Sequence, residues 1–597
     1  MAKYNAKGYR KSSTGYALYP LIVVLVLIPF IVRMHTYETD LDQYAWFLNQ
    51  KESVDLFLYW KSVAITLIGV VLAVLTPIRF RKENISLAKN KWMLILIIYS
   101  VLVIVSTLTS EFSSYGFSGI YEQFESLWVV LAYCLIALYS YVVIKKDSDL
   151  VVMRKALFIL LSVMGVIGLT QLIGMDFFES SLGRVLIAPA AARDSLVFNF
   201  SGSGTHQVYL TLYNPNYVGV FAALLVPIAI MFVFSTEKLT NRLLWLGLVV
   251  ISMLCTLGSG SKSFILSFAA ILVLAVFFCR KLIIRYWKLV LPIGIAIVLV
   301  GGLYFGSRGL NLFQYVKNAL VVQEDDFALE NFEVTKDCFE VTYNGEKLNI
   351  SYAEVDGMIY YFLVDEQGKE IDLQTLDNGK VFVNDERFQD IAVGIYQGNE
   401  LHPYFVGITI NDGLPILFTK NENGYQYVNS CLRYDEINPA EASIFANRVK
   451  FASGRGYIWS RTIPLLKETI LLGTGADSFS LVFPHDDYVM RYNAGYHTSI
   501  ITRPHNMYLQ IAVQHGVLAL VCYLAVCLIY FLQSCKLYWK ADITKSRSLL
   551  GIGIMLGVVG YLIAGMANDS SITVAPLFWL WLGIGFAVNR MNKETAE

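Results

Sequence analysis

A titratable and charged cluster stands directly ahead of a long apolar run in ITRPHNMYLQIAVQHGVLAL, residues 501–520. Pro504 suits the first turn of a helix, where its missing N–H is not needed, so we expect His505 and Asn506 beside a helix N-terminus. The helix dipole there disfavours an imidazolium, and Arg503 acts in the same direction. A neutral His505 could serve as a general base, with Asn506 and Arg503 as substrate-binding candidates. The structural alternative is a histidine that only caps an interfacial helix.

A second basic stretch, SGRGYIWSR, covers residues 453–461. It is typical of a turn into a helix, and it places Arg455 and Arg461 near one helical end as bidentate donors for phosphate oxygens. Trp459, one turn after Arg455, suits a headgroup zone or the face of a sugar. The alternative interpretation is an amphipathic interfacial helix with snorkelling arginines.

A third candidate cation is Lys262 in LGSGSKSFIL, residues 257–266. The Gly and Ser residues predict a very short hairpin between two membrane spans, which directs Lys262 to the side on which the other candidates lie. A tight turn with a lysine of no special role is an equally good interpretation. The stretch is not a P-loop, because the GxxxxGK[ST] spacing is absent.

Two amides flank a proline in TLYNPNYVGVFAALLVP, residues 211–227. Asn214 and Asn216 are expected to lie in a turn that starts a span, where their side chains can cap the helix. Capping is the favoured interpretation, and substrate binding is the alternative role for both.

The elements that must position these residues are membrane helices. Of the 597 residues, 56% are hydrophobic and only 16% are charged, and the mean hydropathy is +0.52, far from the composition of an ordinary soluble domain. Windows of about 20 apolar residues predict a polytopic α-helical membrane protein with about 12 transmembrane helices. The predicted spans begin near Tyr16, Leu58, Trp92, Leu127, Ala156, Tyr217, Leu243, Ser263, Leu289, Gly516, Leu549 and Val574.

The distribution of basic residues predicts the orientation. Most Lys and Arg residues of the short loops lie on the side that holds the N-terminus, so both termini are expected in the cytoplasm. The first span has a basic leader and no small-residue cleavage site, which favours an uncleaved anchor. The candidate residues then share the extracytoplasmic face of a cell membrane.

The chain divides into three parts on this basis: membrane domains over residues 1–306 and 505–597, and an extracytoplasmic segment over residues 307–504. Within that segment, alternating apolar and polar residues between turns predict a small β-rich insert over about 321–440. Helical periodicity returns over 441–504, the candidate catalytic loop. Acidic residues outnumber basic ones in residues 307–504, which argues against a polyanion-binding surface there.

The cysteines carry little functional signal. Six of the eight lie in or beside spans and are expected to act as small hydrophobes. Cys338 and Cys431 lie outside the membrane, where a disulfide could persist, but their proximity is left open by the sequence.

Taken together and in this order, the motifs resemble the O-antigen ligase and O-antigen polymerase (Wzy-type) family of bacterial envelope glycosyltransferases. The resemblance rests on NPNYVG, GSGSKS, the large outer segment with SGRGYIW and LLGTGADSF, and HNMYLQIAVQHG, over roughly residues 200–535. Two positions depart from the family pattern. Lys262 stands where arginine is usual, so the bidentate fork is lost, and Ala519 stands where glycine or a hydroxyl residue is common.

The resemblance implies a fold of the GT-C type and a bacterial plasma-membrane location. It implies a donor glycan on undecaprenyl diphosphate and a glycan acceptor, with no cofactor, no metal and no nucleic acid, and other polysaccharide-assembly proteins as further partners. His505 would be the base, Arg455 and Lys262 would bind the departing diphosphate, and inversion at the sugar would follow. Polymerase and ligase are not distinguished.

Two rival functions remain. Asp40 and Asp42 in YETDLDQY could share a divalent cation with a diphosphate, as in a metal-dependent GT-C enzyme. Twelve spans with both ends inside would also suit a transporter or flippase of lipid-linked glycan, although the centres of the predicted spans hold almost no ionisable residues.

Overall fold

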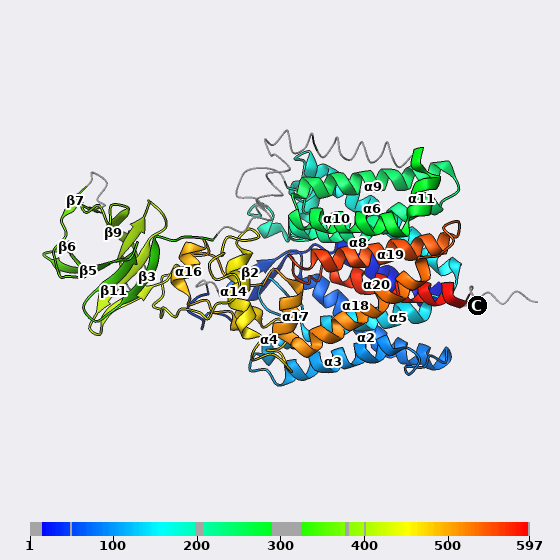
Figure 1. Ribbon diagram of the computed structural model, residues 1–597, viewed down its shortest axis with the longest axis horizontal. Coiled ribbons are helices and arrows are strands. Elements are labelled where there is room, and N and C mark those ends of the chain that lie inside the picture. Colours follow the sequence, from blue (N-terminus) through cyan, green and yellow to red (C-terminus); the bar gives the residue numbers. More distant parts are fainter. Residues whose placement is uncertain are drawn as a thin grey trace, which may run out of the picture.

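The computed structural model describes residues 15–47, 51–196, 207–288, 302, 324–375, 381–398 and 402–594. Figure 1 shows a bundle of long, roughly parallel helices with a β domain at one end of the long axis, and short helices, among them α14 and α16, between the two. We call this end of the bundle the β-domain end.

The bundle is that of a polytopic α-helical membrane protein. Within the described residues, seven helices are long and apolar enough to cross a membrane: α2 (Tyr59–Lys82), α3 (Lys91–Leu108), α6 (Asp147–Leu172), α8 (Pro215–Ser235), α9 (Leu239–Ser259), α18 (Val517–Tyr538) and α19 (Ser546–Ala564). Three shorter apolar segments accompany them: Gly15–Phe30, α5 (Leu127–Val143) and α10 (Lys262–Phe278). The last helix, α20 (Ala575–Glu594), coincides with the last predicted span.

Eleven of the predicted spans thus coincide with helical segments, and the one expected from Leu289 lies outside the described residues, as does the basic leader. The count of twelve stays a prediction. The first segment is irregular: 3-10 turns at Gly15–Leu18 and Ile28–Phe30 flank α1 (Tyr19–Ile22) and a π-helical turn at Val23–Leu27. Pro29 contributes to this at the end of the segment, because it has no N–H to donate to an α-helical ladder.

The centre of the bundle is built on α8 and α19. The apolar window of α8 is 83% buried and that of α19 is 78% buried. Their close approach depends on glycine: a Cβ at Gly557 would lie 2.2 Å from the Leu224 carbonyl oxygen, and one at Gly560 would lie 2.6 Å from that of Ala223. Small residues at a helix contact let the two backbones approach closely inside a membrane.

The β domain contains two antiparallel sheets. One has the order β3-β4-β5-β6: β3 (Leu329–Val334), β4 (Phe339–Tyr343), β5 (Glu346–Val355) and β6 (Met358–Asp365). The other has the order β12-β11-β10-β9-β8-β7: β7 (Leu373–Thr375), β8 (Val381–Val383), β9 (Ile391–Gln397), β10 (Tyr404–Ile410), β11 (Ile416–Asn421) and β12 (Gly424–Val428). The strands lie inside the predicted 321–440 insert.

Short elements join the β domain to the bundle. They are α14 (Arg455–Leu465), α15 (Phe479–Val482), α16 (Tyr488–Asn493) and α17 (Met507–His515). Tyr488 and Val489 of α16 pack into the hydrophobic core of the β domain. The remaining elements are β1 (His35–Glu38), β2 (Glu52–Asp55), α4 (Ser113–Ser118), 3-10 turns at Phe177–Glu179 and Ala190–Ala192, α7 (Ser181–Ile187) and α11 (Arg280–Arg285).

Cys338 and Cys431 are free thiols, so the disulfide left open by the sequence is not formed. The Cys338 sulfur lies 3.5 Å from Oδ1 of Asn349, whereas the Cys431 sulfur lies 3.6 Å from the Trp46 carbonyl oxygen. The two thiols therefore occupy different environments.

Candidate active site

His505 and Asp569 form a pair at the β-domain end of the bundle. Nδ1 of His505 lies 3.0 Å from Oδ2 of Asp569, and the imidazole is 42% exposed while the carboxylate is 1% exposed. The other carboxylate oxygen accepts the backbone N–H of Asn506 at 3.2 Å. No described residue bonds Nε2 of His505. A neutral imidazole that donates from Nδ1 to a carboxylate presents Nε2 as a proton acceptor, so the exposed edge of His505 could deprotonate a hydroxyl.

Three basic side chains act on the charge of Asp569. Burial by itself would raise the pKa of this carboxyl, but His505, Arg503 and Arg455 outweigh burial and hold its pKa below the ordinary value of 3.8. Asp569 is therefore an anion at neutral pH. Because charge interactions weaken with distance, one carboxylate influenced by all three side chains indicates that they share one region.

Lys262 and Arg455 meet at the turn that precedes α14. Nζ of Lys262 donates to Oγ of Ser453 at 3.1 Å, and Nη1 of Arg455 donates to the Ala452 carbonyl at 2.9 Å. Nε of Arg455 is buried and has no partner among the described residues, and burial lowers the pKa of this guanidinium from its ordinary value. A guanidinium with an unused donor can still bind an anionic oxygen.

The hairpin that carries Lys262 packs on the turn at the start of α8. Oγ of Ser261 donates to the Asn216 carbonyl at 3.2 Å, and a Cβ at Gly219 would lie 2.1 Å from that hydroxyl. Asn214 caps α8, because its side chain accepts the backbone N–H of Asn216 at 2.8 Å. The predicted capping role of Asn214 is confirmed, and the contact explains how these two motifs come together.

Trp459 connects α14 to the turn that holds His505. Its indole N–H, the only donor of the side chain, donates to the Pro504 carbonyl at 2.9 Å. Trp459 lies one turn after Arg455 on the same helix. It therefore fixes the base relative to the cation, which is a positioning role.

Arg503 supports the site from inside the protein. Its guanidinium is buried and donates to the Tyr217 hydroxyl and to the Glu122 carbonyl, and it lies 5.8 Å from the ring centre of Tyr213. Since Tyr217 belongs to α8, Arg503 ties the His505 turn to the same helix that the Lys262 hairpin contacts.

Asn506 serves as the N-cap of α17. Its Oδ1 accepts the backbone N–H groups of Tyr508 and Leu509 at 2.9 and 3.1 Å, and its Nδ2 donates to the Met566 carbonyl at 3.1 Å. These contacts favour the structural role for this side chain, because its carbonyl oxygen already accepts two hydrogen bonds.

Arg461 lies apart from the site, which corrects the prediction that it would join Arg455. Nε of Arg461 is 2.8 Å from Oδ2 of Asp487, and the two side chains are only 5% and 3% exposed. Six residues rotate an α-helix by about 240°, so Arg455 and Arg461 lie on different faces of α14. Arg461 is part of a buried ion pair.

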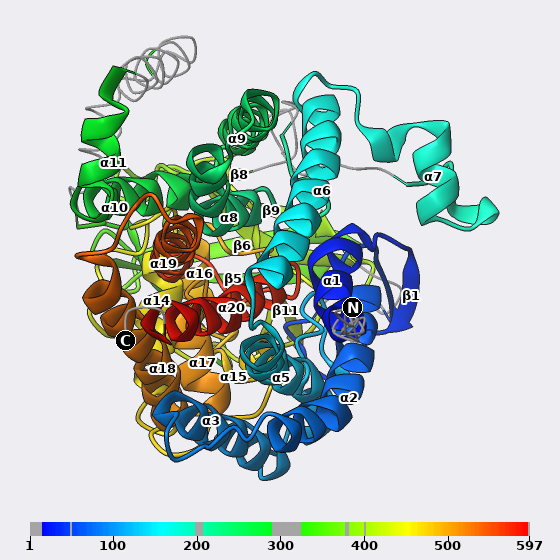
Figure 2. The same ribbon diagram turned by 90° about the vertical axis from the view of Figure 1, so that its right-hand side faces the viewer.

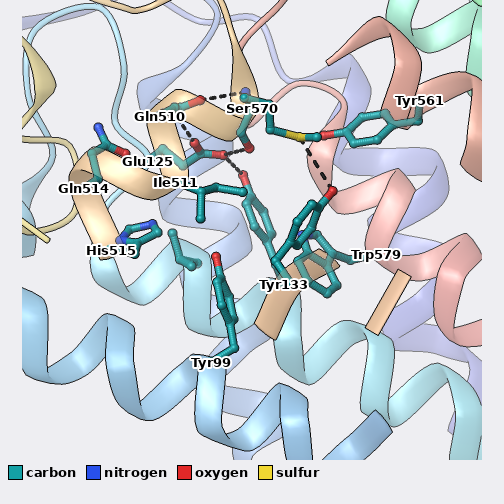
Figure 3. A pocket seen from close by; sticks show the side chains of 13 residues that line it. Tyr99, Glu125, Tyr133, Gln510, Ile511, Gln514, His515, Tyr561, Ser570 and Trp579 are labelled. Carbon is teal, nitrogen blue, oxygen red and sulfur yellow. Dashed lines mark hydrogen bonds between the residues drawn. The ribbon is translucent and has the colours of Figure 1, made fainter. Parts of the chain in front are cut away.

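A buried carboxyl that the sequence motifs do not single out, Glu125, is hydrogen-bonded to Gln510, Ser570 and Tyr133 (Figure 3). It accepts hydrogen bonds from Ser570 and Tyr133 at 2.7 and 2.9 Å and from Gln510 at 3.1 Å. Ser570 follows Asp569 in the chain, and Gln510 lies on α17. Glu125 thus joins the two segments that carry the acid and the base, and burial raises its pKa.

Asp477 is a second buried carboxyl in this region. Burial and the charge of Glu125 raise the pKa of Asp477 to about 8, so it is mainly protonated at neutral pH. Its Oδ2 accepts the backbone N–H of Ile120 at 3.2 Å, and its Oδ1 has no partner among the described residues.

A signal for Asp569 was present in the sequence. It is the sole acidic residue between Asp542 and Glu594, a stretch that holds two helices of the bundle. An ionisable residue next to membrane helices is a candidate functional residue, and it usually pairs with another ionisable side chain or with a backbone carbonyl. Its pairing with His505 could not be inferred, because 64 residues separate them.

The alternative metal-binding residues, Asp40 and Asp42, lie in a loop before β2. Their backbone carbonyls accept from the Tyr115 hydroxyl and from Arg433, each at 2.5 Å. Among the described residues, no group of three or more His, Cys, Asp or Glu side chains is arranged to hold a metal ion.

The fold and site define a polytopic membrane protein with a histidine–carboxylate pair and clustered cations at one end of its bundle. Residues 437–524 match a family model described as O-Antigen ligase. This match confirms the resemblance to the O-antigen ligase and polymerase family, which is associated with glycosyltransferase-like enzymes of polysaccharide assembly. The matched range contains Arg455, Arg503 and His505, whereas Lys262 and Asp569 lie outside it. No curated protein matches the chain.

Proposed function

We propose that the protein is an extracytoplasmic glycosyltransferase that transfers or polymerises oligosaccharide carried on undecaprenyl diphosphate, in the assembly of an O-antigen or capsule-type polysaccharide. It acts in the bacterial plasma membrane with both termini in the cytoplasm, in a GT-C-like bundle. The acceptor is a lipid-linked or wall-linked glycan. The observation that supports this proposal best is the exposed Nε2 edge of His505, paired through Nδ1 with Asp569.

The reaction is assigned to side chains. Nε2 of His505 removes the proton of an acceptor hydroxyl, and the oxygen attacks the anomeric carbon of the donor as the bond to the diphosphate breaks. The electron pair leaves on the diphosphate oxygen, where Arg455 and Lys262 stabilise the charge. Attack opposite the leaving group inverts the configuration at the sugar. Asp569 stabilises the imidazolium that forms.

The test uses purified protein in liposomes with a defined undecaprenyl-linked oligosaccharide, and it scores the ladder of longer products. We expect His505→Ala to reduce transfer about 10²- to 10⁴-fold, the usual contribution of a general base. Arg455→Ala removes a partner of the developing charge, which should cost on the order of 3 kcal/mol in the barrier. His402→Ala in the β domain is the matched control, and it should leave the ladder unchanged.

Three results would contradict the assignment. An unaltered ladder with either site variant removes that residue from the mechanism. Lipid-linked oligosaccharide that crosses the liposome membrane without any change in length would favour the transporter, and activity lost with a chelator would favour the site at Asp40 and Asp42.

A further inference from the structure

Large apolar side chains are exposed on the segment that follows α6. Five of them lie within fourteen residues: Ile173 (68% exposed), Met175 (69%), Leu182 (62%), Val185 (47%) and Leu186 (53%). Single exposed apolar residues are ordinary, but a contiguous group marks a surface that another apolar phase covers.

The short helix α7 directs its apolar side chains away from the protein. Leu182, Val185 and Leu186 fall within an arc of about 100° at 3.6 residues per turn. Gly183 and Ile187 lie on the opposite side and are buried, and a Cβ at Gly183 would lie 2.0 Å from the Phe177 carbonyl oxygen. The stripe that Leu182, Val185 and Leu186 form on the exposed side of α7 is therefore held in place by close packing behind it.

The position of the stripe indicates what covers it. α6 is a candidate membrane span, and Ile159, Val163 and Val166 are exposed along it at the spacing of one helix face. Ile173 lies about two helical turns after Val166 and continues this face. Figure 2 shows α7 to the side of the bundle, beyond α6 and away from the other helices. The stripe is thus continuous with a surface that faces lipid.

We propose that residues 173–187 form an interfacial lipid-binding element, whose exposed apolar side chains insert into the acyl chains of the leaflet at the β-domain end. An amphipathic segment at the end of a span lies in the plane of the membrane interface when its apolar face meets hydrocarbon. The occupant of this surface is the lipid bilayer.

The element is attached to the segment that leads to the candidate active site. The backbone N–H of Met34 donates to the Ile187 carbonyl at 2.7 Å, and the Tyr209 hydroxyl donates to the Asp176 carboxylate. Tyr209 is four residues before Tyr213, whose ring faces the Arg503 guanidinium. Insertion of residues 173–187 would therefore set the height of the site relative to the lipid headgroups.

Photocrosslinking tests this proposal without altering the native cysteines. Benzoylphenylalanine replaces Leu182 or Leu186 in the full chain, with exposed Asp194 as the matched control position. The protein is reconstituted in vesicles of phosphatidylethanolamine and phosphatidylglycerol, irradiated and analysed by intact mass. We expect a mass gain of one phospholipid at positions 182 and 186, several-fold more abundant than at position 194.

Other outcomes would overturn the proposal. Lipid labelling at positions 182 and 186 no greater than at position 194 would show that α7 does not insert its apolar side chains into lipid. A crosslinked dimer from positions 182 and 186 would show that a second copy covers the stripe. Neither result depends on transfer activity, so the test stands apart from the proposed function.

Discussion

Two aspartates are each paired with a basic side chain, and the two pairs differ in exposure. Asp487 and Arg461 are both buried, with 3% and 5% of their side chains exposed. Asp569 is just as buried, but His505 is 42% exposed. A pair whose two partners are enclosed can only hold the scaffold together, whereas a pair with one open edge can act on a substrate.

The charges around the two aspartates differ as well. Burial outweighs the single cation Arg461, so the pKa of Asp487 is raised. His505 and the guanidinium groups of Arg503 and Arg455 together outweigh burial at Asp569, so its pKa is lowered. A surplus of positive charge at a partly open site is what a departing diphosphate requires.

Breaking the enclosed pair should have the largest effect. We expect Arg461→Ala to lower the free energy of unfolding by about 3–5 kcal/mol, because Asp487 is left as a buried charge without its partner. Thermal unfolding in detergent measures this loss. The double variant Arg461→Met/Asp487→Leu is the control, and it should recover most of the stability and retain transfer. A double variant as unstable as the single one would contradict a purely structural role.

Breaking the open pair should affect the reaction instead of the fold. We expect Asp569→Asn to lower kcat about 10²-fold, since an amide keeps the shape but does not stabilise an imidazolium. The Tm should stay close to that of the unaltered protein. Ladder assays at saturating donor measure kcat, and an unchanged rate would show that Asp569 is no more than a structural partner of His505.

Asp477 extends the comparison to a buried carboxyl with no ion-pair partner. Its pKa is 3.8 in the unfolded chain and about 8 in the fold, so between about pH 4 and pH 8 the native state binds more protons than the unfolded state. Stability should therefore fall as the pH rises through this range. We expect Asp477→Asn to flatten this dependence and to be more stable than the unaltered protein at pH 8.

The measurement is Tm against pH for the unaltered protein and Asp477→Asn. The two curves should converge below about pH 4, where Asp477 becomes protonated in the unfolded as well as the folded state. Parallel curves across the whole range would mean that Asp477 does not titrate as its burial requires.

Removing the link between base and cation should have the smallest effect. Trp459→Phe keeps an aromatic ring but deletes the hydrogen bond to the Pro504 carbonyl, which is worth about 0.5–1.5 kcal/mol. If the reaction barrier rises by this amount, we expect kcat to fall about two- to tenfold. Phe445→Leu, at a ring that packs on Trp459, is the control for packing alone. An equal loss in both variants would remove the positioning role.

Much of the fold was predictable from local sequence. Runs of apolar residues located the spans, and alternation between turns located the β-rich insert, because both patterns depend on neighbours a few residues apart. The site was predictable in part. His505, Arg455 and Lys262 stand out as polar residues at the ends of apolar runs, whereas the motif that holds Arg461 does not reveal its buried partner Asp487, 26 residues further along the chain.

The sequence by itself determined that this is a membrane protein with helices, an inserted β domain and basic and histidine residues at one end of its spans. Only the tertiary structure decided that His505 pairs with Asp569, that Arg461 is enclosed with Asp487 and that Glu125 joins the two sides of the site. The physical reason is that hydropathy is a sum over local residues, whereas each of these partners is chosen by how the segments pack.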